Sequence, residues 1–260
     1  MKPLGIYKDK SEFVKIVNEN QHVISKSPLK KGVKEITGNC SACGDQKAKF
    51  KILSDNYRES IICNSCDCNT RNRSVAARIN KEEGKLLFLE AITPLARLMS
   101  YKKRDSIFCE YLGDNYKSGE IIGGIRHENI LDSSLEDQSV NAVISTDVFE
   151  HVADFETAIL ECFRILKPNG KIIFTIPFRG EEETSKRADI KNGKINYIKE
   201  AEYHGNPVSG ASDSLVFTDF GWDIFEIGKR CGFKNCYAEA YAGEDFAIIG
   251  TLVGIFIYEK

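Results

Sequence analysis

Short runs of apolar residues alternate along the chain with longer segments in which apolar side chains recur every three or four positions. The runs lie at residues 85–90, 106–111, 140–145 and 171–176. Because each run is apolar at consecutive positions, both of its faces are expected to be buried, as in a parallel sheet covered by helices. The pattern therefore predicts an α/β domain in which strands and helices alternate.

The segment after the third run shows how one helix is specified. Asp154 is a suitable N-cap, and Pro168 with the turn Asn169–Gly170 ends the helix. Between these limits one apolar stripe follows at helical spacing: Phe155, Ala158, Ile159, Cys162, Phe163 and Leu166. We expect this stripe to pack against the sheet.

Polar residues follow directly after the predicted strands. They occupy the segments 90–93, 110–111, 127–130 and 146–151. In open α/β sheets, ligands bind beyond the carboxyl ends of the strands, so these segments are expected to form a site. Glu110 stands 20 residues after Glu90, where an acid can take both hydroxyls of a nucleoside ribose. Taken alone, Glu110 is better explained as an acid that caps a strand end.

Four of the nine cysteines form two pairs with two-residue spacing. Cys40 and Cys43 are one pair, and Cys63 and Cys66 follow after 19 intervening residues. Four thiolates on two such turns can surround a structural zinc ion, and metal binding would stabilise a module with little core of its own. Disulfides or free thiols are the alternatives, and Cys68 competes with Cys66 as the fourth ligand. The other cysteines are expected in the core: Cys109, Cys162, Cys231 and Cys236.

Charge divides unevenly along the chain. Residues 1–85 hold 17 Lys and Arg against 10 Asp and Glu, whereas residues 86–260 hold 19 against 28. The basic front favours an acidic ligand or is simply a solvated lysine-rich surface. Arg71, Arg73 and Arg78 suggest contact with phosphate or nucleic acid. Aromatic residues do not interleave with them and the net charge is -2, which argues against that interpretation.

The first residues lack the apolar core of a secretory signal, and the apolar run at 246–258 is too short to span a bilayer. We therefore expect no membrane contact and a cytoplasmic location, with reduced cysteines. Three regions are expected: a helical, basic segment at 1–38, a zinc-ribbon-like module at 39–80, and an α/β domain at 81–260. Nothing in the pattern indicates an oligomeric state.

A resemblance to the class I S-adenosylmethionine-dependent methyltransferases is carried by residues 140–178, VNAVISTDVFEHVADFETAILECFRILKPNGKIIFTIPF. Members often read Phe-Asp-x-Val before an Asp-Val-Leu-Glu-His-Val turn and a helix ending Arg-x-Leu-Lys-Pro-Gly-Gly. Residues 220–233, FGWDIFEIGKRCGF, resemble the family's last helix and its turn into the final strand pair. The resemblance covers 85–258 and implies a Rossmann-like, doubly wound, mostly parallel sheet of seven strands with an antiparallel last strand. The cysteine pairs resemble a zinc ribbon that precedes some of these enzymes.

The resemblance implies how the strand ends bind S-adenosylmethionine. Glu90 would lie near the methionine end of the cofactor and Glu110 would bind the ribose. Asn129 would hydrogen-bond the adenine, and Ile130 would pack on it. The implied cofactor-binding set is Glu90, Ala91, Thr93, Glu110, Tyr111, Asn129, Ile130, Thr146, Asp147 and Val148.

The turn after the strand at 140–145 is expected to face the methyl group. Thr146, Asp147 and Val148 would line the floor beside the sulfonium, with His151 nearby. Asp147 and His151 are therefore candidate catalytic residues. Glu150 is expected either at the site or as a cap of backbone amides, and packing on the next helix is the alternative for His151.

The sequence departs from the family at the first turn. The family usually has Gly-x-Gly there, which lets the backbone approach the cofactor, whereas this chain reads Glu90-Ala91-Ile92-Thr93-Pro94. Thr93 can cap the next helix at 94–101, and Pro94 fits its first position. The missing glycines leave the affinity for the cofactor open, and they argue against a nicotinamide cofactor more strongly.

An insertion at residues 179–219 separates the two segments that carry the resemblance, 140–178 and 220–233. A connection of this length beside the expected site is typical of a lid or an acceptor pocket. His204 within it, next to Glu202 and Tyr203, is the third candidate catalytic residue and the favoured general base, with polar surface as the alternative.

We expect methyl transfer to a small-molecule acceptor, with a saccharide or polyol hydroxyl as the favoured target. The Asp/Asn-Pro-Pro-aromatic motif of amino-nucleobase methyltransferases is absent, as is the Pro-Cys nucleophile of cytosine-C5 enzymes. The alternatives are an RNA methyltransferase that docks through the basic front, and a catalytically silent fold that serves as a binding module.

Overall fold

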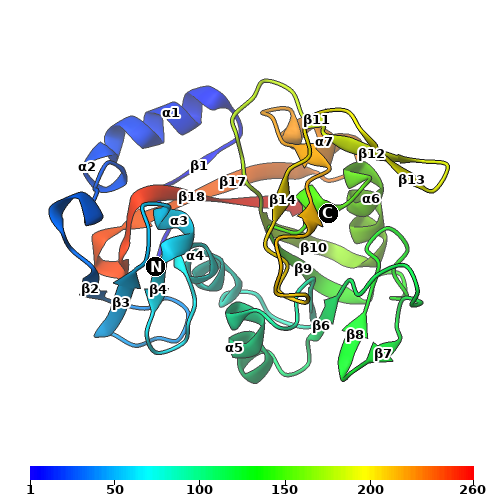
Figure 1. The fold of residues 1–260 in the computed structure, drawn as a ribbon, viewed down its shortest axis with the longest axis horizontal. Coiled ribbons are helices and arrows are strands. Elements are labelled where there is room, and N and C mark those ends of the chain that lie inside the picture. Colours follow the sequence, from blue (N-terminus) through cyan, green and yellow to red (C-terminus); the bar gives the residue numbers. More distant parts are fainter.

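A nine-stranded sheet forms the centre of the computed structural model, which describes residues 1–260 (Figure 1). Its strands, in spatial order, are β1 (Gly5–Tyr7), β17 (Asn235–Gly243), β18 (Ile248–Glu259), β10 (Leu166–Thr175), β9 (Val140–Thr146), β5 (Leu86–Phe88), β6 (Ile107–Glu110), β8 (Ile125–His127) and β7 (Ile121–Ile122).

The seven strands from β17 to β8 are the predicted sheet. Pairs β8–β6, β6–β5, β5–β9 and β9–β10 are parallel, and β18 runs antiparallel to both of its neighbours. The mostly parallel sheet with an antiparallel last strand is thus confirmed. The sequence did not predict the two short edge strands, β1 and β7, which pair antiparallel with β17 and β8.

Each face of the sheet is covered by helices, so the apolar runs are buried on both sides as expected. Val143 points into one core together with α6 and α7, while its neighbours Ala142 and Ile144 point into a second core together with α4 and α5. The helices are α1 (Lys10–Glu19), α2 (Gln21–Ile24), α3 (Tyr57–Ser60), α4 (Thr70–Ile79), α5 (Pro94–Lys102), α6 (Phe155–Ile165) and α7 (Ile224–Arg230). None of them combines the length and the apolar character that crossing a membrane requires.

The helix starts follow the sequence closely. Asp154 caps α6 by accepting a hydrogen bond from the backbone N–H of Thr157, and Thr93 caps α5 by accepting one from Ala96. The helix α6 ends at Ile165, and Asn169 adopts a left-handed conformation with φ 63° in the predicted turn. These caps fix where the segments before the helices, which carry the site, leave the sheet.

The cysteine pairs lie on a small antiparallel sheet of β2 (Glu35–Gly38), β3 (Ala48–Ile52) and β4 (Ile61–Cys63). The module does not have a separate core. Cys40 and Phe50 belong to the same buried cluster as Val253 of β18. A short 3-10 turn, Leu29–Lys31, precedes the module, and another at Glu244–Phe246 packs beside it.

The insertion folds into three small two-stranded ladders above the carboxyl ends of the central strands (Figure 1). They pair β11 (Ser185–Lys186) with β16 (Thr218–Asp219), β12 (Ala188–Lys191) with β13 (Lys194–Tyr197), and β14 (Tyr203–His204) with β15 (Ser214–Leu215). The insertion is anchored to the turn after β9, because Phe217 N–H donates to the Glu150 carbonyl at 2.7 Å.

Candidate functional site

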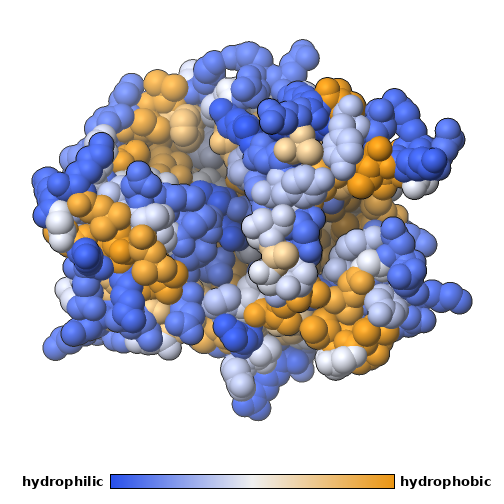
Figure 2. Space-filling view, in the orientation of Figure 1, coloured by the Kyte–Doolittle hydropathy of each residue, from blue (hydrophilic) through white to orange (hydrophobic).

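Two adjoining pockets open at the carboxyl ends of the strands. One has a volume of about 460 Å³ and mostly apolar walls, and is called the apolar pocket; the other, of about 850 Å³, is called the polar pocket. Their common wall is formed by Leu89, Glu110, Tyr111, Val148 and His151. Figure 2 shows a hydrophilic hollow between the segment 39–80, here called the cysteine module, and the insertion. The arrangement can hold two ligands that touch each other.

The apolar pocket contains the residues expected to bind adenine. Asn129 and Ile130 line it after β8. The side-chain oxygen of Asn129 accepts a hydrogen bond from Leu131 N–H at 3.0 Å, while its amide nitrogen makes no hydrogen bond within the protein. Tyr111 is half exposed, and its hydroxyl donates to Asp114. The pocket therefore offers one free donor and an apolar packing surface.

The insertion forms the opposite wall of the apolar pocket. Ile190, Gly193 and Ile195 of the β12–β13 hairpin line it, together with Phe217. Ile190 and Ile195 are about half exposed. An apolar ligand in this pocket would cover these side chains and gain hydrophobic stabilisation in proportion to the area removed from water.

The first turn is held by a buried acid. Glu90 accepts hydrogen bonds from the hydroxyls of Thr146, at 2.8 and 2.9 Å, and Thr93, at 2.7 Å. Burial raises the pKa of the Glu90 carboxyl. All three residues line the polar pocket, as the sequence placed them together.

A second acid closes the turn that lacks Gly-x-Gly. One oxygen of Glu110 accepts hydrogen bonds from the backbone N–H groups of Ala91, at 2.8 Å, and Ile92, at 3.3 Å. Ala91 thus contacts the site through its backbone and lines neither pocket. The other oxygen of Glu110 makes no hydrogen bond within the protein. Burial raises the pKa of this carboxyl.

Asp147 is bound by two arginines that reach it from the cysteine module. Arg58 donates to both of its oxygens, at 2.6 and 2.8 Å, and Arg71 Nε lies 3.3 Å away. The hydroxyl of Thr175 donates to it at 2.7 Å. Burial would raise the pKa of Asp147, but the charges of Arg71 and Arg58 outweigh burial and hold it well below the usual range. Such a carboxylate is a poor proton acceptor at neutral pH.

The backbone at Asp147 is also unusual, with φ 54°. This left-handed conformation is uncommon for a residue with a side chain, although aspartate tolerates it better than most. The arginine contacts stabilise it and thereby set the path of the turn from Thr146 to Val148. Both neighbours line the polar pocket.

A second cluster of polar side chains is formed by Glu150, His151 and His204, which the sequence placed at or near the site. One ligand atom each from Glu150, His151 and His204 all lie within 4.8 Å of one another. The two imidazole rings are 5.1 Å apart and perpendicular. Glu150 is fully buried and neither of its oxygens has a hydrogen-bond partner. The insertion therefore delivers His204 to the turn after β9, and all three side chains line the polar pocket.

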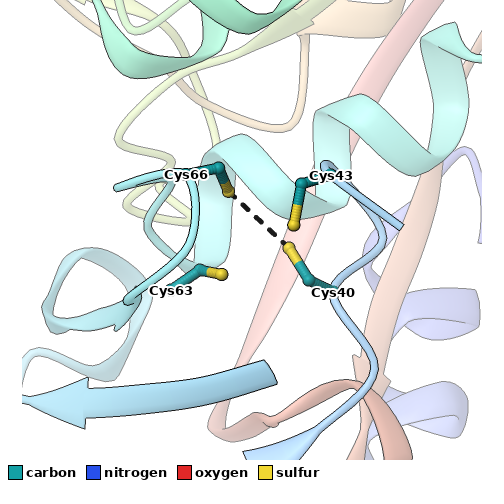
Figure 3. A group of neighbouring side chains, drawn as sticks. All are labelled: Cys40, Cys43, Cys63 and Cys66. Carbon is teal, nitrogen blue, oxygen red and sulfur yellow. Dashed lines mark hydrogen bonds between the residues drawn. The ribbon is translucent and has the colours of Figure 1, made fainter. Parts of the chain in front are cut away.

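The four cysteines of the two pairs point toward one another (Figure 3). Their sulfur atoms all lie within 4.8 Å of one another, and the Sγ atoms of Cys40 and Cys66 are 3.8 Å apart. Two sulfurs on a tetrahedral zinc ion at ~2.3 Å would be about 3.8 Å apart, so the residues fit the metal. Cys68 is not among the four. None of the nine cysteines is in a disulfide.

The two cysteine turns have the same backbone form. Gly44 N–H donates to Cys40 O and Asp67 N–H donates to Cys63 O, both at 2.9 Å. Gly44 and Asp67 both have left-handed conformations, with φ 88° and 58°. Matching turns at the two ends of a hairpin bring four sulfurs together from opposite sides.

The arginines after the cysteines face inward, which corrects the suggestion that they contact nucleic acid. Arg73 has no exposed surface, lies over the Phe50 ring at 4.3 Å, and donates to Ala247 O at 3.0 Å. Arg78 is 6% exposed. Arg71 bonds Glu59 at 2.9 and 3.2 Å. Arg73 and Arg78 therefore form no surface for phosphate, and Arg71, which lines the polar pocket, is already paired with Glu59 and Asp147.

Arg58 is the main residue that sequence reasoning missed. It lies 89 positions before Asp147, and no local motif connects the two. The only available signal was the surplus of basic residues in the first 85 positions. The wall contributed by Ile190 and Ile195 was missed likewise, although the insertion itself was expected beside the site.

Comparison with known proteins gives a consistent result for the central segment. The sequence model of the methyltransferase domain family matches residues 106–174. A segment of 55 residues is 40% identical to a probable S-adenosylmethionine-dependent methyltransferase of Mycolicibacterium smegmatis and covers 21% of this chain and 21% of that protein. The matched region thus spans about a fifth of that relative.

Solved structures are similar at lower identity. An S-adenosylmethionine-dependent methyltransferase from Archaeoglobus fulgidus matches with a TM-score of 0.46 and 12% identity, over 73% of this chain and 94% of that one. Another from Mesorhizobium loti matches with a TM-score of 0.45 and 11% identity, over 72% and 96%. Residues 106–174 are therefore similar to the methyltransferase domain family, and the mostly parallel sheet with its antiparallel last strand contains this segment.

Proposed function

We propose that the protein transfers a methyl group from S-adenosylmethionine to an oxygen of a small-molecule acceptor, with a saccharide or polyol hydroxyl as the favoured target. The observation that carries this proposal is the shared wall of the two pockets. A nucleoside in the apolar pocket and an acceptor in the polar pocket would both contact Glu110, Val148 and His151. Two reactants held side by side in this way react at a greatly increased effective concentration.

The cofactor supplies an electrophilic methyl group on a sulfonium, and residues of this chain fit its parts. The free oxygen of Glu110 suits the ribose hydroxyls, because the other oxygen is already engaged by the first turn. The free amide of Asn129 suits an acceptor nitrogen of adenine, and Ile130 suits its ring. Thr146 and Val148 would form the floor near the sulfonium, and Glu90 would lie near the methionine end.

The walls of the polar pocket favour a hydroxyl-rich acceptor over a nucleic acid. Six acids line it, against two arginines: Glu59, Asp67, Glu90, Glu110, Asp147, Glu150, Arg58 and Arg71. Both arginines are already paired with carboxylates. An excess of negative charge repels phosphate, whereas carboxylates readily accept hydrogen bonds from hydroxyls. An RNA acceptor is therefore the second candidate.

A hydroxyl acceptor must lose its proton during transfer. We propose His204 and His151 as the residues that bring this about, since both face the polar pocket. The carboxylates of Glu150, first, and Glu202 raise the pKa of His204, which makes it a stronger base. We assign Asp147 a positioning role instead, because two arginines hold its carboxylate.

The region 39–80 would be a structural zinc module bound through Cys40, Cys43, Cys63 and Cys66, with the α/β domain at 81–260 as the catalytic part. A site of four thiolates leaves no open coordination position, which suits a structural role. Such thiolates require a reducing compartment, so we place the protein in the cytoplasm.

Titration calorimetry with S-adenosylmethionine and S-adenosylhomocysteine tests the proposal. We expect both to bind, and we expect a labelled methyl donor to label a saccharide or polyol in a metabolite panel. A folded protein that binds neither nucleoside would be a silent module. Label in tRNA or rRNA alone, with binding weakened steeply by salt, would establish the RNA enzyme instead.

A further inference from the structure

Glu150 is a buried carboxylate without a compensating partner. Its side chain has no exposed surface, and neither oxygen accepts a hydrogen bond. The only basic groups within 4 Å of it are the imidazoles of His151 and His204. Burying an unpaired carboxylate is strongly unfavourable, so a positive charge is expected at this position.

The ring orientations define where that charge would lie. His151 Nδ1 is 2.8 Å from the Leu215 carbonyl oxygen, which can only accept, so Nδ1 carries the hydrogen. His204 Nε2 is 3.2 Å from Glu202 Oε1, so Nε2 carries the hydrogen there. The second nitrogens, Nε2 of His151 and Nδ1 of His204, face Glu150 Oε1 at 3.6 and 3.8 Å. Two nitrogen lone pairs and a carboxylate oxygen thus converge on one place.

We propose that Glu150, His151 and His204 bind one divalent transition-metal ion, such as Zn²⁺, Mn²⁺ or Co²⁺, in the wall of the polar pocket. Ligand atoms that share a metal at ~2.1 Å lie about 3 to 3.5 Å apart. A contraction of a few tenths of an ångström would bring both imidazole nitrogens to that distance from Glu150 Oε1. Two imidazoles with one carboxylate suit these metals better than Mg²⁺ or Ca²⁺, which prefer oxygen ligands.

The contacts behind the two imidazoles support a metal site. Imidazoles that bind metals almost always donate their other N–H to a backbone carbonyl or a carboxylate. His151 has the Leu215 carbonyl in that position and His204 has Glu202. Glu202 is held in turn by Arg179 at 2.5 and 2.6 Å. The insertion therefore supplies one ligand and the supports of both histidines.

The catalytic consequence of this inference rests on the proposed function, whereas metal binding itself does not. With three protein ligands, the ion keeps an open position toward the polar pocket. An acceptor hydroxyl bound there would release its proton to water more readily. Its oxygen then forms the bond to the methyl carbon as the carbon–sulfur bond breaks and its electron pair returns to sulfur. His204 would in that case act through the metal.

Metal counting on the full chain tests the proposal. We would exchange the bound metal by dialysing the folded protein against excess Co²⁺, and compare wild type with Glu150→Gln and His204→Gln, using Glu200→Gln on the exposed part of the insertion as the matched control. Cobalt at the cysteines gives sulfur charge-transfer bands, whereas the second site contains no sulfur. We expect wild type and Glu200→Gln to hold one equivalent more than either site variant, at least about tenfold tighter than any residual binding.

Several outcomes would overturn the inference. One is equal stoichiometry in wild type and both site variants; another is loss of the second equivalent in Glu200→Gln as well. Saturation of wild type at the cysteine equivalent alone would mean that a shared proton, and not a metal, neutralises Glu150. Nucleoside binding by calorimetry reads out the proposed function separately. It also verifies that each variant is folded, because the apolar pocket lies outside the substituted residues.

Discussion

Asp147, which is partly buried, and Glu150, which is fully buried, are carboxylates three positions apart in one turn, yet their surroundings on the two sides of the polar pocket differ. On the side of the cysteine module, Arg58, Arg71 and Thr175 surround Asp147 with donors. On the side of the insertion, Glu150 receives only two imidazole nitrogens beyond hydrogen-bonding distance. We infer that the contacts on the module side fix the geometry of this turn, whereas the residues on the insertion side provide the groups for the chemical step.

A carboxylate with charged partners and a carboxylate without them are suited to different roles in a protein. A carboxylate with ideal donors is locked in one protonation state and one position, which suits it to hold a backbone turn. An unpaired carboxylate keeps capacity for a proton, a metal or a substrate, and functional sites often contain such groups. Substitutions on the two sides should therefore affect different measurements.

The largest effect is expected from the metal ligands. Cys63→Ser should leave little folded protein, because structural zinc binding is worth roughly 10–16 kcal/mol and whole domains are stable by only about 5–15 kcal/mol. Zinc content and thermal melting measure this. Cys68→Ser is the matched control and should keep about one equivalent of zinc. A native melting curve for Cys63→Ser would break the view that the module side is a rigid support.

On the insertion side, His204→Ala should reduce turnover by at least about a hundredfold, on the scale of general acid–base catalysis, and leave the affinity for S-adenosylmethionine unchanged. Turnover with the identified acceptor and calorimetry separate the two. The exposed His22→Ala serves as the control. Turnover like that of wild type would reduce His204 to polar surface and transfer the role to His151.

On the module side, Arg58→Ala should destabilise the protein by about 3 kcal/mol, at the low end for breaking a buried ion pair, because Arg71 and Thr175 still hold Asp147. The freed turn should also raise KM for the cofactor more than it lowers kcat. Arg58→Lys cannot donate to both oxygens and should recover only part of the loss. An effect on kcat alone would contradict the positioning role.

At the shared wall, Glu110→Ala should weaken S-adenosylmethionine binding at least about tenfold, the equivalent of ~1.4 kcal/mol. The variant would lose the hydrogen bonds that the ribose hydroxyls donate to one oxygen of Glu110. It would also lose those that the backbone N–H groups of Ala91 and Ile92 donate to the other. Calorimetry on the folded variant measures this, with Glu136→Gln, an exposed acid that lines neither pocket, as the control. Unchanged affinity would mean that the nucleoside does not occupy the apolar pocket.

The smallest expected effect is a change in stability when the charge of Glu150 is removed. In protein that holds zinc at the four cysteines but no metal at Glu150, Glu150→Gln should be as stable as wild type or more stable by about 1 kcal/mol, because removing an unpaired buried charge relieves an unfavourable term. Chemical denaturation measures the free energy of unfolding. Marked destabilisation would show that the Glu150 carboxylate has a stabilising partner in solution, as the Asp147 carboxylate does.

Much of the fold was readable because its determinants are local. The cap at Asp154, the Thr93–Pro94 start of α5 and the cysteine spacing each involve residues a few positions apart, and all appear where expected. Glu90 and Glu110 were placed at strand ends by periodicity, and both line the polar pocket.

The rest depends on contacts between distant segments. The Arg58–Asp147 pair joins residues 89 apart, and the carbonyl of Leu215 that orients His151 lies 64 positions further along the chain. A backbone carbonyl has no signature in sequence at all. The three-residue strand β1 was missed for the same reason, since its partner β17 starts at Asn235.

Arg73 also has consequences for the order in which the chain is made on the ribosome. Its carbonyl partners at Phe246 and Ala247 are synthesised more than 170 residues later. Until these two residues are synthesised, the Arg73 guanidinium, which is buried in the folded protein, can contact only groups close to it in the sequence, such as Thr70 and Phe50. Domains usually begin to fold as the amino-terminal part appears. Early capture of a metal by the four cysteines would therefore keep this segment from misfolding while the nascent chain waits for its final strand.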